Sequence, residues 1–389
     1  MGTPVIIDAV RTPLGKRKGW LAGVHPAQLL GFVQREVLSR AGVDPELVEQ
    51  VVGGCVTQAG EQSNDMVRRA WLHAGLPQHT GGTAIDAQCG SGQQATHLVA
   101  DMISAGTITV GIACGVEAMS RIPLGANVPP GMGDPRPDDW TIDMPNQFEA
   151  ADRIAKHRGI TRADLDAFGL ASQQKARVAV DEGRFKREIA AYDAPVLDEE
   201  GKPTGERRLV DTDQGLRDTT LEGLSGLRTV LPDGMHTAGT SSQISDGACA
   251  VVVMSKAKAE ELGLEWLAEI GAHGMVAGPD STLQLQPANA TAKACAKEGI
   301  EPSSLDLVEF NEAFAAVGIA SARALGLPDE KVNVNGGAIA LGHPVGMSGA
   351  RVVLHLALEL KRRGGGTGAA ALCGGGGQGD ALIVRVPSN

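Results

Sequence analysis

The sequence predicts an α/β fold made of two similar halves, each with a strand–helix–strand unit. In the first half, an apolar strand over 83–87 is followed by a helix from Gly90 and a second strand over 110–114. The same order recurs over 332–372. Strands joined by such a helix favour a parallel sheet. The recurring order indicates an internal duplication, and a chain of 389 residues is too long for one simple core.

Local patterns give the elements of the first half. Residues 4–10 form an apolar strand, which ends in the three residues leading to Pro13. Apolar residues at helical spacing over 26–41 predict an amphipathic helix. Gly115 is expected to end the strand over 110–114.

The second half repeats this order. A strand over 332–334 precedes a helix over 346–363, and a strand over 369–372 ends at Gly374. Because sequence identity between the halves is low, the order of elements is the basis for the duplication.

The middle of the chain has a different character, so we expect an insertion over 118–243. Prolines and glycines over 121–140 predict a long irregular segment. Residues 148–180 are helical and rich in charge, and 198–233 is mostly polar. Strand-like apolar sequence returns at 248–254.

Composition excludes several functional classes. Aromatic residues make up only 3% and the net charge is −11, which argues against binding nucleic acid or an anionic membrane. Six single cysteines without zinc spacing predict no metal site. No apolar run is long enough to cross a membrane, and no signal peptide is visible, so we expect a cytoplasmic protein.

Three glycine-rich stretches each present one reactive side chain, and these are Cys89, His343 and Cys373. Two thiols and an imidazole are the groups that acyl transfer through a thioester needs. Cys89 and His343 precede equivalent helices of the two halves. At a helix start, backbone N–H groups and the helix dipole favour a thiolate.

Each of these residues also has a simpler interpretation. A single cysteine is often an inert core residue, and His343 could be an ordinary loop histidine. Asn311 follows a strand over 305–310 and could cap a helix, with Glu312 in its first turn. A side-chain amide at that position could also hold a water or a carbonyl oxygen.

A dinucleotide site is the main alternative for the first stretch. Residues 90–95 fit the pattern G-x-G-x-x-A, and Glu117 lies where a ribose-binding acid is sought. Against this, the preceding strand is not the first of its sheet, and the bulky Cys89 precedes the first glycine. No G-x-S-x-G motif is present, which disfavours a serine hydrolase.

Together the three stretches, with Asn311-Glu312-Ala313-Phe314 between the first and second, resemble the thiolases, and the resemblance runs essentially end to end. It is strongest to actinobacterial 3-ketoacyl-CoA thiolases that shorten steroid side chains. The stretches that carry this closer resemblance are 16–20, 53–64, 89–95, 144–162 and 237–247.

The resemblance implies a five-layered α-β-α-β-α fold with two duplicated halves and an inserted loop domain. The N-terminal half would comprise 1–117 and 244–266, the loop domain 118–243, and the C-terminal half 267–389. It further implies a homodimer or homotetramer.

The resemblance also implies the roles of the site residues. Cys89 matches the acylated nucleophile, His343 the imidazole that activates it, and Cys373 the acid/base thiol. Asn311 matches the residue that holds a water in a first oxyanion hole shared with His343. The N–H groups of Cys89 and Gly375 would form the second.

Coenzyme A would lie against the inserted loop domain. Ser242 and Arg217 match positions that contact it, and 145–148 would form part of the acyl-pocket wall. Two positions depart from the usual family pattern, because Thr240 replaces an asparagine and Gln243 a glycine. Both departures concern the choice of acyl chain and leave the chemistry unchanged.

The implied reaction is the reversible thiolysis of a 3-ketoacyl-CoA to acetyl-CoA and a shortened acyl-CoA, in β-oxidation of a fatty acyl or steroid side chain. Coenzyme A would be a co-substrate, with no tightly bound cofactor, nicotinamide or metal. A biosynthetic acetoacetyl-CoA thiolase is the alternative. A ketosynthase-type condensing enzyme, a dinucleotide-dependent oxidoreductase and a non-catalytic lipid-binding relative are further rivals.

Overall fold

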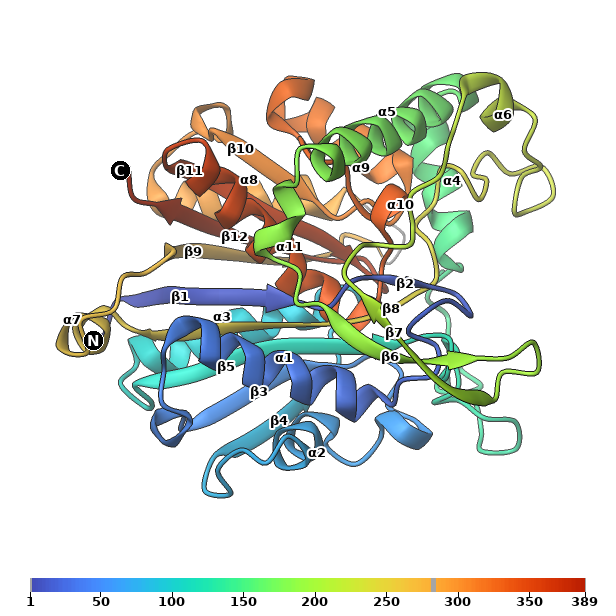
Figure 1. Cartoon of the computed structure of the whole chain (residues 1–389). Helices are drawn as coiled ribbons and strands as arrows, with labels where there is room; N and C mark the ends of the chain where they lie inside the picture. The colour runs from blue at the N-terminus through green and yellow to red at the C-terminus, as the bar shows by residue number, and fades with distance from the viewer. Residues whose placement is uncertain (1, 281–284, 389) are drawn as a thin grey trace.

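A mixed sheet runs through the molecule (Figure 1). The computed structural model describes residues 2–280 and 285–388, and within them ten strands join this sheet. They are β1 (Pro4–Arg11), β2 (Gly15–Lys16), β3 (Gln50–Gly54), β4 (Gly81–Ile85), β5 (Val110–Ala118), β8 (Ser245–Ser255), β9 (Ala268–Ala277), β10 (Leu307–Phe310), β11 (Gly366–Gly374) and β12 (Gln378–Val386). Their order is β10-β11-β12-β9-β1-β8-β5-β3-β4, and β2 pairs with β8.

The sheet consists of two portions, which in the described part of the chain are linked where β1 meets β9, at the pairs Val5–Glu269 and Ile6–Ala268. The predicted parallel pairing is present in β3–β4, β3–β5 and β10–β11. The other pairs are antiparallel, so the expectation of a parallel sheet was only partly right. One physical reason is that β12 follows β11 through a tight turn, which leaves no room for a crossover helix.

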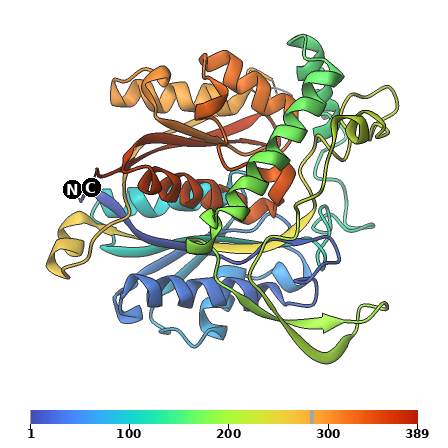
Figure 2. The same cartoon turned by 45° about the horizontal axis from the view of Figure 1, so that its top comes forward.

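Helices complete five layers, as the resemblance implied (Figure 2). The outer helices of the N-terminal portion are α1 (Pro26–Ala41) and α2 (Met66–His73). The central layer is α3 (Ser91–Ser104) and α11 (Val345–Arg362), which pack against strands of both portions. On the far side are α8 (Gln286–Glu298) and α9 (Ala315–Leu325). Both chain ends lie on the side away from the segment between β5 and β8.

The central helix α11 is buried along nearly its whole length. Most of its residues are apolar or small, as expected for a helix enclosed on all sides. It nevertheless carries buried polar residues at three- and four-residue spacing, which places them on one face: Ser348, Arg351, His355 and Glu359. The N-terminal end of this polar stripe lies beside His343.

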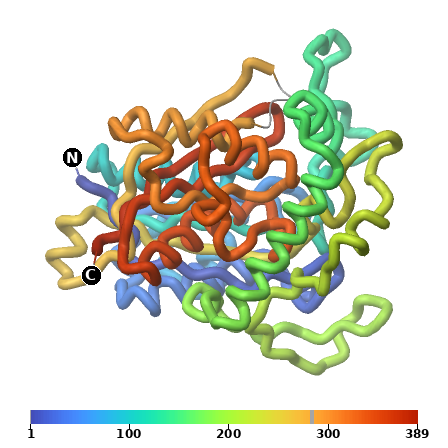
Figure 3. Tube along the Cα trace, turned by 90° about the horizontal axis from the view of Figure 1, so that it is seen from above, coloured from blue at the N-terminus to red at the C-terminus, as the bar shows by residue number. Residues whose placement is uncertain are grey.

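The segment between β5 and β8 holds α4 (Gln147–His157), α5 (Arg162–Asp181), α6 (Leu221–Ser225) and a hairpin of β6 (Tyr192–Leu197) and β7 (Pro203–Val210). Figure 3 shows α5 along one side of the molecule and the β6–β7 hairpin projecting from the body of the molecule. The sequence did not predict the hairpin, because β7 is polar and exposed and lacks apolar alternation. The irregular segment over 121–140 was predicted correctly, and residues 127–143 are exposed.

Two expected element boundaries were wrong. The strand over 332–334 is absent, and Val332 makes only one bridge, to Val308. Asn333 has a positive φ of 46° and hydrogen bonds both the N–H and the C=O of Phe310, so its side chain replaces regular pairing. Strand β5 also continues past Gly115, because β8 pairs with it as far as Ala118.

Among residues 2–280 and 285–388, no helix has both the length and the apolarity to cross a membrane. In the same ranges, no three His, Cys, Asp or Glu side chains are grouped so that they could hold a metal ion.

Candidate functional site

Four chain segments meet near the carboxyl ends of the parallel strands. Cys89 follows β4 and immediately precedes the N-cap of α3, and Asn311 directly follows β10. Cys373 lies near the end of β11, which runs parallel to β10. His343 lies between the short helix α10 (Ala338–Leu341) and α11. Carboxyl ends of parallel strands are where α/β proteins place their functional groups.

The turn that presents Cys89 is tightly held. Gln88 has a positive φ of 54°, which is uncommon for a residue with a side chain. The Ser91 hydroxyl donates to the Gln88 carbonyl at 2.6 Å and accepts from the Ala87 N–H at 2.9 Å. The Cys89 side chain is half-buried against three apolar residues, Val56, Met119 and Val345.

Burial favours the protonated form of the Cys89 thiol. Its pKa is raised to about 11, first by desolvation and then by the carboxylates of Asp86 and Glu117. This direction is opposite to the thiolate that the helix start was expected to favour. The apolar surroundings and the two carboxylates outweigh the hydrogen bond that the thiolate would accept from its own N–H.

The hydrogen bonds of His343 fix its orientation and tautomer. Its Nδ1 lies 2.7 Å from the Ser348 hydroxyl, which donates to the Pro344 carbonyl at 2.9 Å. Because the hydroxyl proton of Ser348 points to the Pro344 carbonyl, Nδ1 must carry a hydrogen and donate it in a hydrogen bond to the Ser348 oxygen. Nε2 then carries no hydrogen and presents its lone pair, and it lies 3.3 Å from the Asn311 side-chain nitrogen.

The imidazole of His343 is neutral. Desolvation, and then the charge of Arg351, lower its pKa to about 3. Together with the raised pKa of Cys89, this gives a neutral thiol and a neutral base in the resting site.

Cys373 is 3% exposed, and burial raises its pKa. A negative charge on Cys89 would raise it further, so the two cysteines belong to one site. Around Cys373 lie Phe148, Ala151, Ala313, Phe314 and Val317.

The glycine run after Cys373 packs against the turn before Cys89. A Cβ at Gly375 would lie 2.8 Å from the Gln88 side-chain oxygen, so a larger residue would not fit without movement. The backbone of Gly375 is thereby held beside the Cys89 turn.

Asn311 is fully buried and lies in the site. Its N–H donates to the Ala371 carbonyl at 2.9 Å, and its side-chain oxygen accepts from Arg351 at 3.4 Å. Helix α9 begins at Ala315 with Phe314 at its N-cap, so the interpretation of Asn311 as a helix cap was wrong. The neighbouring Glu312 binds elsewhere.

Glu312 holds the segment that leads to His343. Its carboxylate accepts from the Ser172 hydroxyl at 2.6 Å, the Asn333 side chain at 2.9 Å and the Ile339 N–H at 3.2 Å. It was expected in the first turn of a helix and lies before one.

Ser242 and Arg217 lie outside the cluster of thiols and imidazole. The Ser242 N–H donates to the Ala313 carbonyl at 3.0 Å, two residues from Asn311. Arg217 lines a cavity of about 270 Å³ whose other lining residues include Leu224, Leu227, Ala238 and Ile339. Because Ile339 belongs to α10, this cavity adjoins the segment that leads to His343.

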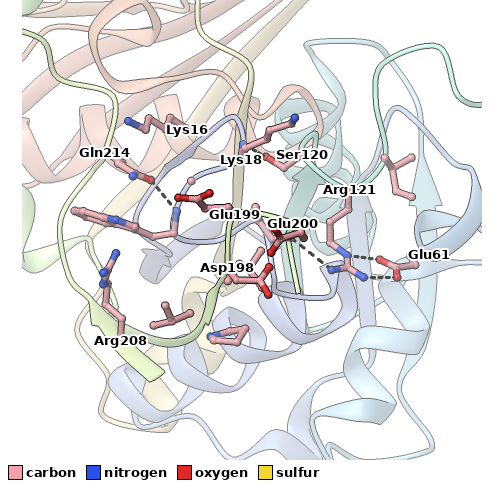
Figure 4. Close-up of a pocket in the computed structure, with 18 of the residues that line it drawn as sticks. Lys16, Lys18, Glu61, Ser120, Arg121, Asp198, Glu199, Glu200, Arg208 and Gln214 are labelled. Carbon is pink, nitrogen blue, oxygen red and sulfur yellow. Dashed lines mark hydrogen bonds and ion pairs between the residues drawn. The ribbon is translucent and has the colours of Figure 1, made fainter. Parts of the chain in front are cut away.

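A second, larger groove of about 860 Å³ lies beneath the β6–β7 hairpin (Figure 4). None of the predicted site residues lines it. Its charged residues are four cations and four carboxylates: Lys16, Lys18, Arg121, Arg208, Glu61, Asp198, Glu199 and Glu200. This balance does not favour a polyanion such as coenzyme A.

The dinucleotide interpretation of 90–95 fails on packing. A Cβ at Gly92 would lie 2.7 Å from the Ala350 N–H nitrogen, so this glycine admits the backbone of α11. A pyrophosphate would need the start of α3, which Cys89 and the carboxylate of Asp380 face instead.

Three residues that organise the site were not predicted. Ser348 and Arg351 are polar residues in an otherwise apolar helix, and this contrast is the signal that could have found them. The Gln243 side chain donates to three carbonyls, those of Gly215, Ile339 and Ala340, at 2.8, 3.0 and 3.1 Å. The Gln243 carbonyl also accepts from the His343 N–H at 3.2 Å.

Comparisons with known proteins cover nearly the whole chain. The family model for the N-terminal domain of thiolase matches residues 4–257, and the model for the C-terminal domain matches 264–386. A probable acetyl-CoA acetyltransferase of Mycolicibacterium smegmatis is 45% identical over 98% of this chain and all of its own length. One of Mycobacterium tuberculosis is 44% identical over 99% of the chain and all of its own length.

A 3-ketoacyl-CoA thiolase of Bacillus subtilis is 38% identical over 99% of the chain and 100% of its own length. Both family models and full-length relatives thus agree with the five-layered fold. The chain belongs to the thiolase family of acyltransferases.

Proposed function

We propose that this protein catalyses the reversible thiolysis of a 3-ketoacyl-CoA, with Cys89 as nucleophile, His343 as its base and Cys373 as the second acid/base. The observation that supports this most is the meeting of two thiols from different halves beside a neutral imidazole. A thiolase needs both thiols, whereas a ketosynthase-type enzyme would place histidine or asparagine in the second role.

The first half-reaction begins with proton transfer from the Cys89 thiol to Nε2 of His343. The sulfur attacks the 3-keto carbon and a tetrahedral oxyanion forms. Its collapse breaks the bond between C2 and C3, leaving an acyl group on Cys89 and the enolate of acetyl-CoA. Cys373 gives its proton to the enolate carbon and becomes a thiolate.

The second half-reaction restores the enzyme. The Cys373 thiolate takes the thiol proton of an incoming coenzyme A, whose sulfur attacks the acyl group on Cys89. The shortened acyl-CoA leaves, and His343 returns its proton to the Cys89 sulfur. Each step can run backward, so the same groups can condense two acyl-CoA molecules.

Fixed donors stabilise the two developing negative charges. Asn311, through a water, and protonated His343 form one oxyanion hole for the enolate oxygen. The N–H groups of Cys89 and Gly375 form the other, for the tetrahedral oxyanion. Burial makes such donors more effective, because little water competes.

The inserted segment over 118–243, as a loop domain, binds coenzyme A. The cavity beside Arg217 combines a cation for phosphate with apolar walls that suit an adenine ring. Ser242, whose N–H donates to the Ala313 carbonyl, contributes a second contact to coenzyme A. The domain boundaries proposed with it are 1–117 and 244–266 for the N-terminal half and 267–389 for the C-terminal half.

For the acyl group we favour a bulky steroid side chain in a β-oxidation pathway. The support is the resemblance of 144–162 and 237–247 to thiolases of that kind. Phe148, within the first stretch, packs edge-on against Phe314 with ring centroids 5.0 Å apart, beside Cys373. Acetoacetyl-CoA in biosynthesis is the second candidate, because the mycobacterial relatives are named acetyl-CoA acetyltransferases.

The protein further acts as a homodimer or homotetramer in the cytoplasm, with coenzyme A and acyl-CoA as its only partners and no metal or nicotinamide. The support for assembly is β4, which pairs with β3 alone and so leaves its outer edge open within the chain. All six cysteines are free thiols, which suits a reducing compartment.

The test is a thiolysis assay with acetoacetyl-CoA, a long-chain 3-ketoacyl-CoA and a steroid side-chain 3-ketoacyl-CoA, without added metal or NAD. We expect coenzyme A-dependent cleavage that is lost in Cys89→Ala and Cys373→Ser, and the highest kcat/KM for the steroidal substrate. A strong preference for acetoacetyl-CoA would assign the biosynthetic role instead. No cleavage of any substrate would contradict the function.

A further inference from the structure

Glu117 is a fully buried carboxylate near the carboxyl end of β5. It accepts four hydrogen bonds, from the N–H groups of Val56, Thr57 and Gly346 at 3.0 Å each and from the Gln62 side chain at 2.8 Å. Burial raises the pKa of this carboxyl, but all four partners are donors, and only the ionised form satisfies all of them. The sequence suggested Glu117 only as a ribose-binding acid, and the proposed reaction gives this residue no role.

One of these bonds crosses between the halves and caps the central helix. Helix α11 begins at Val345, and its N-cap residue, Pro344, offers no side-chain cap. The Glu117 carboxylate instead accepts from the Gly346 N–H in the first turn. A negative charge at that end is stabilised by the helix dipole.

The start of α11 is also seated closely on the N-terminal half. A Cβ at either Gly54 or Gly115 would overlap the Gly346 carbonyl oxygen. Gly54 is the last residue of β3 and precedes Val56 by two positions. Gly115 lies within β5 and precedes Glu117 by two positions. The first turn of α11 is therefore fixed by close packing as well as by the hydrogen bond.

The bonds of Glu117 reach both sides of the reacting pair. Val56, whose N–H it holds, packs against the Cys89 side chain. Val345, next to the Gly346 that it caps, packs against the same side chain and lies two residues after His343. The Glu117 carboxylate thus connects Val56, which packs against Cys89, to the start of α11, which directly follows the loop that carries His343.

We infer that Glu117 is a positioning residue, which holds His343 at the distance from Cys89 that proton transfer requires. This inference rests on the proposed function of the two residues. Burial, and then the carboxylates of Asp86 and Glu117, also raise the pKa of the Cys89 thiol.

The variant Glu117→Gln tests this. The amide NH2 of glutamine would point at N–H groups that also donate, so at least one of the four hydrogen bonds is lost. Helix α11 also loses the negative charge at its N-terminus. We expect kcat to fall by about 100-fold, as for a misplacement of about 1 Å, with KM for the acyl-CoA little changed. Iodoacetamide should alkylate Cys89 at lower pH than in the wild type, since a negative charge beside the thiol is gone.

Glu359→Gln is the matched control. Glu359 is also a buried carboxylate. It lies on the polar stripe of α11 and accepts from Arg362, Arg363 and Asn335 at the end of that helix opposite to Gly346. It should lower the melting temperature without moving kcat or the alkylation profile. If both variants lose activity in proportion to their loss of stability, Glu117 is structural only and the inference fails.

Wild-type acylation separates this inference from the proposed function. If the wild type forms no acyl-Cys89, the proposed function itself fails. If it does and Glu117→Gln turns over within about threefold of it, only the positioning role is overturned. Should Glu117→Gln not fold, Gln62→Met removes one donor to the carboxylate, and an unchanged kcat in that variant would equally contradict the inference.

Discussion

At the scale of single residues, the site differs most from expectation in its protonation. A helix start and a nearby imidazole suggest an ion pair of thiolate and imidazolium, as in many cysteine enzymes. Here desolvation dominates, and the pKa of Cys89 is about 11 while that of His343 is about 3. In the proposed mechanism, the proton would therefore move from sulfur to nitrogen only when substrate brings a carbonyl to the thiol.

The pH dependence of alkylation follows from this. The rate at which iodoacetamide modifies Cys89 should rise with pH up to about pH 11, because the thiolate fraction increases until the raised pKa is passed. Peptide mapping by mass spectrometry after timed labelling measures it. A plateau reached below pH 7 would show a preformed ion pair and contradict the neutral resting state.

Ser348 fixes the tautomer of His343, so its loss should impair the base. Ser348→Ala leaves the Nδ1–H without its acceptor, and the imidazole is free to rotate or to move its proton to Nε2. We expect kcat to fall by roughly 10- to 100-fold, part of the full contribution of a general base. Ser321→Ala is the control, since that buried hydroxyl has no partner among the described residues. Equal rates for the two variants would count against the assignment of the tautomer.

At the scale of elements, the segment from α10 to α11 is held from several directions. Glu312 and Gln243 bind its start, Ser348 binds His343 itself, and the N-terminal half seats the first turn of α11. Between α10 and α11 lie Gly342, His343 and Pro344, so the side chains that hold the two helices determine where His343 lies.

A substitution at Gln243 tests how much these contacts contribute, because this position is usually glycine in the family. Gln243→Leu leaves the carbonyls of Gly215, Ile339 and Ala340 without their shared donor. We expect a loss of about 1–3 kcal/mol in the free energy of unfolding, measured by urea denaturation, and a lower kcat. Gln78→Leu, at an exposed position, should change neither. A fully stable and active Gln243→Leu would show that the other contacts suffice.

Sequence reasoning singled out Cys89, His343 and Cys373 because they lie in local patterns. A reactive side chain between a strand and a helix, flanked by glycines, can be recognised without the fold, and the structure brings the segments that carry these three residues together. Glu117 could not be assigned, because its partners are 55 to 229 residues away and three of them are backbone groups. The strand expected over 332–334 failed because a single side chain, Asn333, replaces the pairing.

At the scale of the whole molecule, one buried arginine connects three parts of the chain. Arg11 on β1 donates to Glu188, which precedes β6, and twice to Asp213, which follows β7. Glu188 also pairs with His355 on α11. Burial tends to raise the pKa of Glu188, but Arg11 and His355 prevail and lower it to about 2. The N-terminal half, the inserted segment and the central helix therefore share one charge network.

Removing Arg11 should loosen all three. Arg11→Met leaves two carboxylates buried without their cation, and we expect a loss of about 3–5 kcal/mol in the free energy of unfolding. Arg11→Met combined with Glu188→Gln should recover part of it, because one uncompensated charge is gone. Urea denaturation of both variants measures this. A loss below about 1 kcal/mol would mean that the network contributes little to holding these parts together.

The most direct test of the chemistry proposed for this protein is to trap and map its acyl-enzyme. Incubating the protein with acetyl-CoA or another acyl-CoA, quenching in acid and digesting it allows the thioester to be located by mass spectrometry. The acyl group should lie on Cys89, should be absent in Cys89→Ala, and should persist in Cys373→Ser when an activated thioester supplies it. An acyl group on Cys373 or another cysteine, with Cys89 free, would contradict the assignment of nucleophile and acid/base.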